Sequence, residues 1–143
     1  MNKIIPLVLL FIAIYIGWSQ FIRPNDSADY ADQSDTALSS AFDERKSGVQ
    51  VQGNGIVIKI LPDDNEGSPH QRFIMKLNSG QTLLVSHNID LAPRIPTLRE
   101  GDIVSFNGEY EWNAKGGVIH WTHHDPRGRH VAGWLKHNGQ TYQ

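Results

Sequence analysis

The fold of this 143-residue chain is limited first by short runs in which apolar and polar residues alternate one by one. Residues 71–77, 82–87 and 104–112 follow this period of two, which places every second side chain on the same face of a β-strand. Residues 49–60 and 118–123 are two further runs, rich in the β-branched residues that strands favour. We therefore expect five strands, and the 13 glycines and 7 prolines supply the turns between them.

The phase of the first run changes along its length. Its apolar residues lie on one face before a pair of glycines and on the other face after it. A glycine-associated bulge or coil in this strand would explain the change. The residues concerned are Val49, Val51, Gly53, Gly55, Ile56, Ile58 and Ile60.

The order of the predicted strands indicates a mainly β fold. Three strands in a meander, a longer connection over residues 87–102 and two more strands predict a small five-stranded OB-like barrel, the oligonucleotide- and oligosaccharide-binding type. Asn107 and Gly108 could form a two-residue turn, but the alternation continues through Trp112 and favours one long fourth strand.

Two further elements flank the barrel. Apolar residues at helical spacing between residues 27 and 46 predict one α-helix before it, with Gly48 as the stop. After the fifth strand, Asn138 and Gly139 predict the two-residue turn of a small terminal hairpin.

The N-terminus has the properties of a membrane segment. Residues 4–22 are apolar except for Ser19 and Gln20, and these nineteen residues span about 28 Å as a helix, close to the thickness of a bilayer core. An uncleaved transmembrane helix is favoured over a cleaved signal peptide, because no small-residue cleavage site follows and Trp18 suits a membrane interface. The flanking charges favour an orientation with the C-terminal domain outside the cytoplasm. If the host is a two-membrane bacterium, we expect a single-pass protein of the bacterial inner membrane with its C-terminal domain in the periplasm.

The chain therefore divides into three parts. Residues 1–23 are a membrane anchor or signal segment, residues 24–48 an acidic tether with the amphipathic helix, and residues 49–143 the barrel with its terminal hairpin. The absence of cysteine excludes disulfides, thiolate metal sites and cysteine nucleophiles. Acidic and basic residues balance in the barrel, which argues against nonspecific nucleic-acid binding, although its C-terminal end is basic.

Residues 116–130 contain more reactive side chains than any other stretch. On a strand, His120 and His124 would lie about 13 Å apart, too far to share a metal ion. Ile119 and Trp121 are expected to face the interior of the barrel with Tyr110, and the histidines to be hydrogen-bonded or on the surface. The residues that we expect to bind a ligand are Trp112, His120, His124, Asp125, Arg127, Arg129 and Trp134.

No cofactor is expected, and no complete catalytic motif is present, so the sequence leaves enzymatic activity open. A metal site would require histidines and carboxylates to converge from separate loops. The residues considered for such a site are His70, His87, His123 and Asp125.

Four sequence motifs point to one family. HQRFIMKL, HNIDLAPRIP, GEYEWNAKGGVIHWTHHDP and GWLKHNGQTY resemble a small uncharacterised bacterial family, domain-of-unknown-function family 3465, over about residues 47–142. The resemblance implies short proteins with one N-terminal hydrophobic segment. It implies no activity and no catalytic residues.

Three hypotheses of function remain. The first is a membrane-anchored, extracytoplasmic binding module for an oligosaccharide, a nucleic acid or an envelope protein, with an anionic ligand favoured by the basic end. The alternative is a metal-dependent hydrolase, a nuclease or phosphodiesterase, that uses loop histidines and aspartates. The third is a structural subunit that docks on another membrane protein through its terminal hairpin.

Overall fold

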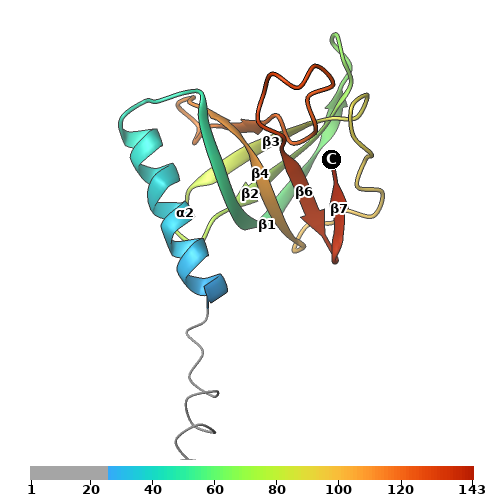
Figure 1. Cartoon of the computed structure of the whole chain (residues 1–143). Coiled ribbons are helices and arrows are strands. Elements are labelled where there is room, and N and C mark those ends of the chain that lie inside the picture. The colour runs from blue at the N-terminus through green and yellow to red at the C-terminus, as the bar shows by residue number, and fades with distance from the viewer. Residues whose placement is uncertain (1–25) are drawn as a thin grey trace, which may run out of the picture.

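A computed structural model describes residues 26–143, which form one helix and seven strands (Figure 1). The predicted membrane segment, residues 4–22, lies outside these described residues. Within residues 26–143, no helix combines the length and the apolar character needed to cross a membrane. The elements are α2 (Asp26–Asp43), β1 (Val49–Asp64), β2 (His70–Lys76), β3 (Thr82–Asn88), β4 (Ile103–Glu111), β5 (Val118–His120), β6 (Trp134–His137) and β7 (Gln140–Tyr142).

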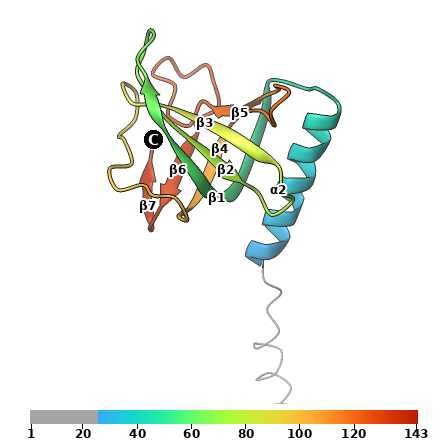
Figure 2. The same cartoon turned by 180° about the vertical axis from the view of Figure 1, so that it is seen from behind.

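Five of the strands close into a ring, in the order β1, β2, β3, β5, β4 and back to β1 (Figure 1 and Figure 2). Strand β1 closes the ring because its first half pairs with β4 and its second half with β2. Strands β3 and β5 are parallel, and the other pairs in the ring are antiparallel. The prediction of a mainly β fold with one helix and five principal strands is confirmed.

Strand β1 differs from the prediction, because no bulge lies at its glycines. Its register with β4 is unbroken over residues 49–56, and the irregularities come later, opposite β2. Gly53 and Gly55 therefore stay in phase with the buried Val51 and Val57. A Cβ atom at Gly53 would lie 3.0 Å from the Phe106 ring, so a side chain there would require the ring to shift. The three isoleucines lie on the outer face, 42–48% exposed: Ile56, Ile58 and Ile60.

Helix α2 covers the end of the ring where the β2–β3 and β4–β5 turns lie. Leu38 is completely buried in the core. The Asp35 carboxylate accepts a hydrogen bond from the Ser79 backbone amide at 2.9 Å, and Trp112 Nε1 donates to the Phe42 carbonyl at 3.0 Å. The predicted helix is confirmed, but it ends earlier than expected, and Arg45 rather than Gly48 first takes the left-handed conformation, at φ 54°.

The C-terminal hairpin and the fourth strand follow the predictions. Asn138 and Gly139 have φ values of 49° and 77°, the left-handed pair that a tight hairpin turn requires. Strand β6 pairs with β4 and β7 pairs with β6, so the hairpin extends the sheet. Strand β4 runs without a break through Asn107 and Gly108.

Strand β5 is shorter than predicted. The expected strand over residues 118–123 ends at His120, because Trp121 adopts a left-handed φ of 53° that interrupts the alternation. Ile119 and Tyr110 are fully buried, as predicted. The prediction that Trp121 faces the interior is wrong, since its side chain is only partly buried and lies outside the core.

His87 is completely buried beside the core. Its Nε2 lies 3.0 Å from the Pro93 carbonyl, which can only accept, so Nε2 carries the proton and Nδ1 accepts from the Thr122 hydroxyl at 2.7 Å. Burial lowers the pKa of His87 to about 4. The folded protein therefore holds this ring neutral in mild acid.

Because the unfolded chain takes up a proton at His87 near pH 6.5 and the folded chain only near pH 4, the stability should fall as pH decreases between these values. The expected loss is about 3 kcal/mol. Urea unfolding at a series of pH values measures it. The His87→Gln variant should lose less stability over this range, and the exposed-site control His124→Gln should behave as the wild type; equal pH slopes in all three would refute this role of His87.

Candidate functional site

The loop between β5 and β6 carries several exposed polar and charged side chains. Strand β4 pairs along one edge with β5 and then with β6, and the chain leaves the sheet between them at residues 121–133. The Gly133 amide donates to the His123 carbonyl at 2.9 Å. A Cβ atom at Gly133 would lie 1.8 Å from the Trp121 carbonyl oxygen, so only glycine lets the two ends of the loop approach so closely.

Asp125 fixes the conformation of the loop. Its Oδ1 accepts from the Arg127 amide at 2.9 Å, and its Oδ2 accepts from the amides of Arg129 and His130 at 2.8 and 2.9 Å. The hydrogen bonds from Arg127 and Arg129 hold the pKa of the Asp125 carboxyl below its ordinary value. Asp125 is therefore an ionised acceptor that orders the backbone bearing the two exposed arginines.

The rings of Trp121 and His130 stack at a centroid distance of 3.9 Å and an angle of 8°. They line an open surface pocket of about 560 Å³ together with the arginines of the loop. A second pocket, of about 250 Å³, adjoins the first, because Trp121 and Leu91 line both. The other residues of the first pocket are Asp125, Pro126, Arg127 and Arg129, and those of the second are His70, Ser86, Asn88, His120 and His123.

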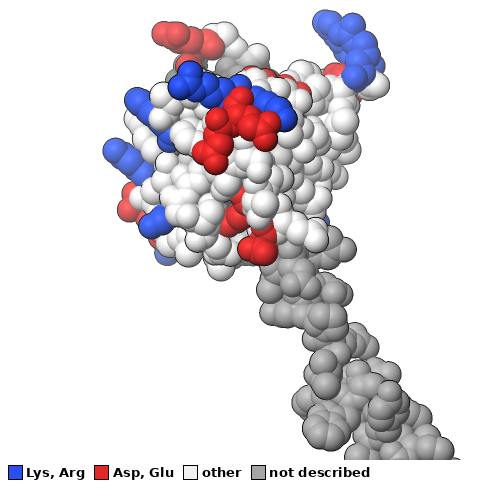
Figure 3. All heavy atoms as spheres, turned by 90° about the vertical axis from the view of Figure 1, so that its left-hand side faces the viewer, with Lys and Arg blue, Asp and Glu red and all other residues white. Residues whose placement is uncertain are grey.

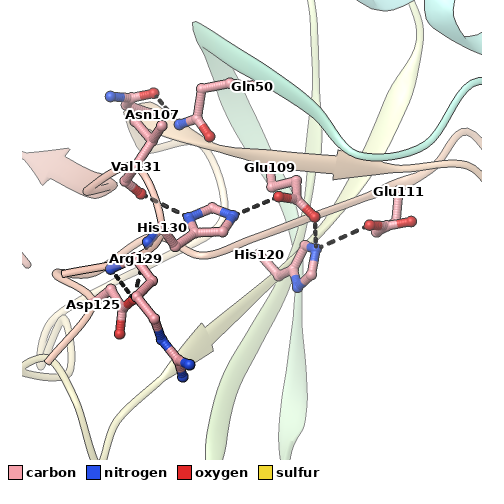
Figure 4. A network of polar contacts seen from close by, with 9 residues as sticks. All are labelled: Gln50, Asn107, Glu109, Glu111, His120, Asp125, Arg129, His130 and Val131. Atoms are coloured by element: carbon pink, nitrogen blue, oxygen red, sulfur yellow. Dashed lines mark hydrogen bonds and ion pairs between the residues drawn. The ribbon is translucent and has the colours of Figure 1, made fainter. Parts of the chain in front are cut away.

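His130 also links the loop to strand β4 (Figure 4). Its Nε2 lies 2.5 Å from Glu109 Oε2 and its Nδ1 lies 2.8 Å from the Val131 carbonyl, so a doubly protonated ring donates to both. Burial alone would lower the pKa of His130, but the bond to Glu109 and the Val131 carbonyl raise it above its ordinary value. Burial alone would raise the pKa of Glu109, but the bond from His130 and the contacts with Glu111 and His120 hold it below its ordinary value. Both shifts favour an imidazolium–carboxylate pair.

The other oxygen of Glu109 belongs to a cluster on the outer face of β4 and β5. His120 Nε2 lies 3.4 Å from Glu109 Oε1 and 3.4 Å from Glu111 Oε1 (Figure 4). Among the described residues, these three side chains form a group whose potential ligand atoms all lie within 4.8 Å of one another. The buried Nε2 of His120 has no hydrogen-bond partner in the part of the chain that the structure describes.

The expected ligand-binding residues fall into separate places. Asp125, Arg127 and Arg129 meet at the first pocket, His120 lines the second, and His124 is exposed on the same loop. Trp112 packs against helix α2 instead, with Phe42 at a ring distance of 6.4 Å. Trp134 lines a different pocket of about 510 Å³, between β1, β4 and α2, and Lys136 lies over its ring at 4.4 Å.

The four residues considered for a metal site do not converge. No three of His70, His87, His123 and Asp125 are among the described side chains that gather within 4.8 Å of one another. Each has a local partner instead: His70 Nδ1 lies 2.7 Å from the Ser68 carbonyl and His123 Nδ1 lies 2.7 Å from the His124 carbonyl.

Sequence reasoning missed Glu109, Glu111 and the part played by His130. The first two stand two residues apart on a predicted strand, so they share its outer face. That spacing was the available signal. The pairing of Glu109 with His120 across β4 and β5 completes the cluster, and it depends on a register that the sequence does not contain.

One comparison with known proteins finds the family that the sequence resembles. A comparison with curated proteins finds none that matches the chain. A family model described as "Protein of unknown function (DUF3465)" matches residues 24–143, which include every helix and strand of the described part. The chain therefore belongs to the DUF3465 family.

Proposed function

We propose that this protein is an OB-like barrel module that binds an anionic oligosaccharide in the two adjoining pockets beside Trp121, with residues 4–22 holding it at the periplasmic side of the inner membrane. The ring order of its strands, with β3 parallel to β5, supports the OB-like architecture. The observation that carries the proposal is the meeting of two pockets at one aromatic residue, under a loop with two exposed arginines.

The position of the pockets favours an elongated ligand. The second pocket is lined by residues of β2, β3 and β5, and OB folds bind oligomers across the β2–β3 face. The first pocket continues it beyond Trp121 toward the basic loop. An oligomer that lies across both would contact the tryptophan in the middle and the arginines at one end.

The charges of the site favour a ligand that is negatively charged and is bound at the pocket rather than over a broad surface. Arg127 and Arg129 line the first pocket, and the carboxylate of Asp125 is occupied by three backbone amides. Arginine forms paired hydrogen bonds with carboxylate or phosphate. On the face shown in Figure 3, acidic and basic side chains lie among uncharged ones without a wide region of one sign, so a broad polyanion-binding surface is not supported there.

An oligosaccharide suits the aromatic side chain better than a stacked base. The Trp121 ring already has His130 stacked on it, and the His123 ring lies 5.2 Å from it at 35°. Nucleobases bind OB folds by stacking on free aromatic faces. Because the stacked His130 and the tilted His123 leave less of the Trp121 ring free for a base, a ligand held mainly through its hydroxyl and carboxylate groups, such as an acidic sugar, fits better.

Binding can be measured by calorimetry with the full-length chain in a non-ionic detergent. An oligogalacturonate should bind, a neutral oligosaccharide of the same length should bind more weakly, and oligothymidylate should not exceed the acidic sugar. Replacing both Arg127 and Arg129 with alanine should lower the affinity by about tenfold or more, because charge-assisted hydrogen bonds are lost. The control, alanine at Lys59 and Lys76, removes the same charge from exposed strand positions and should change it little.

Each other outcome has a meaning. Tighter binding of oligothymidylate would replace the oligosaccharide with single-stranded nucleic acid. If the neutral sugar binds as tightly as the acidic one, the protein does not recognise the negative charge. If the lysine control loses as much affinity as the arginine variant, the ligand does not bind in the first pocket.

Asp125→Ala should weaken binding of the same oligogalacturonate although both arginines remain, because the loop must then be ordered when the ligand binds. Hydrogen exchange should become faster at the amides of Arg127, Arg129 and His130, which lose their acceptor. Asp90→Ala, in the exposed β3–β4 connection, is the matched control. Unchanged exchange at these three amides would show that Asp125 does not hold the loop.

A further inference from the structure

We infer that Glu109, Glu111 and His120 form a binding site for a divalent transition-metal cation, for which Zn²⁺ is the best fit. The site lies on the outer face of β4 and β5, beside the proposed ligand pockets. It does not depend on which ligand those pockets hold.

The backbone alone brings the three side chains together. Glu109 and Glu111 are two residues apart on β4 and therefore point to the same face. Glu109 is the direct cross-strand partner of His120, and Glu111 is diagonal to it. Two carboxylates and an imidazole thus meet on two rigid, paired strands, which hold a metal site more precisely than loops do.

The distances between the three side chains leave room for an ion between their ligand atoms. His120 Nε2 lies 3.4 Å from one oxygen of each carboxylate, and no hydrogen bond joins it to either. This nitrogen is inaccessible to solvent, and a buried polar atom without a partner is costly. A cation at the centre would satisfy the nitrogen and neutralise the two carboxylates at once.

His130 gives Glu109 the support that metal ligands commonly have. It binds Glu109 Oε2 at 2.5 Å and leaves Oε1 directed at His120 (Figure 4). The ring is itself held by the Val131 carbonyl and by stacking on Trp121. A partner of this kind fixes the orientation of the ligand.

The donor set indicates which cation binds. One imidazole nitrogen and two carboxylate oxygens suit a first-row transition metal better than Ca²⁺ or Mg²⁺, which prefer oxygen alone. Three protein ligands with the remaining position open to solvent are typical of an accessible zinc site. Since the side chains are 20–40% exposed, the two carboxylates can shift to admit an ion to the buried His120 nitrogen.

The competing explanation is a protonated His120 paired with both carboxylates, and zinc titration of the full-length chain in a non-ionic detergent separates the two. Calorimetry should show that one Zn²⁺ binds per chain. Nitrogen-15 NMR of the histidine rings should show that zinc changes the chemical shift of Nε2 of His120. Zinc should also raise the unfolding temperature, because it binds the assembled site of the folded chain more tightly than the unfolded chain.

Each of Glu109→Gln, Glu111→Gln and His120→Asn should weaken zinc binding by more than about 100-fold. This exceeds the effect usual for a residue that only hydrogen-bonds to a metal ligand. His130→Gln, which removes only such a partner, should weaken it by about 10- to 100-fold. The matched controls are Glu66→Gln, Glu100→Gln and His124→Asn, at exposed positions, and they should bind zinc as the wild type does.

Several results would overturn the inference. They are no saturable binding to the wild type, unchanged affinity in the three cluster variants, or a loss that is equally large in the controls. If a cluster variant is less stable without metal, Glu111→Asp, which keeps the charge on a shorter side chain, provides a second test and should bind more tightly than Glu111→Gln.

Discussion

The close contact between Gly133 and the Trp121 carbonyl lets strand β4 pair with two strands along one edge. If residue 133 had a side chain, a Cβ atom 1.8 Å from that carbonyl oxygen would force the chain apart. Strand β6 could then not follow β5 along β4, and the loop of residues 121–133 would not be held against the sheet. The pocket walls, the stacked pair of Trp121 and His130, and the bond from His130 to Glu109 all depend on this closure.

The imidazole ring of His130 links the loop to the acidic cluster of the sheet. His130 presents its face to Trp121 and its Nε2 to Glu109, so it connects the basic pocket with the acidic cluster on the strands. The two proposed sites therefore share a wall. An anion near the arginines and a cation among the carboxylates would also be electrostatically compatible, because each ion lies among side chains of the opposite charge.

The strands and the terminal hairpin could be predicted from the sequence, because period-two alternation and a turn such as Asn138–Gly139 are set by residues that are close in the chain. Prediction failed where distant residues decide the conformation. Gly53 and Gly55 stay in phase because β1 pairs without a break with β4, which is far along the chain, so the isoleucines of β1 lie on the surface. Trp121 has the polarity of a core residue, yet the turn toward Gly133 takes it out of the strand. His120 and His130 lie in the histidine-rich stretch of the sequence, but their acidic partners lie on β4 and follow only from the strand register.

We propose that the loop held against β4 forms the ligand-binding surface of this protein. Mapping of amide chemical shifts during a titration with oligogalacturonate tests it most directly, because each backbone position reports separately. We expect the largest changes at Leu91, Trp121 and residues 127–130, which line or support the two pockets. Changes concentrated instead on the exposed isoleucines of β1, or around Trp134, would contradict the account and place the binding surface on another face of the ring.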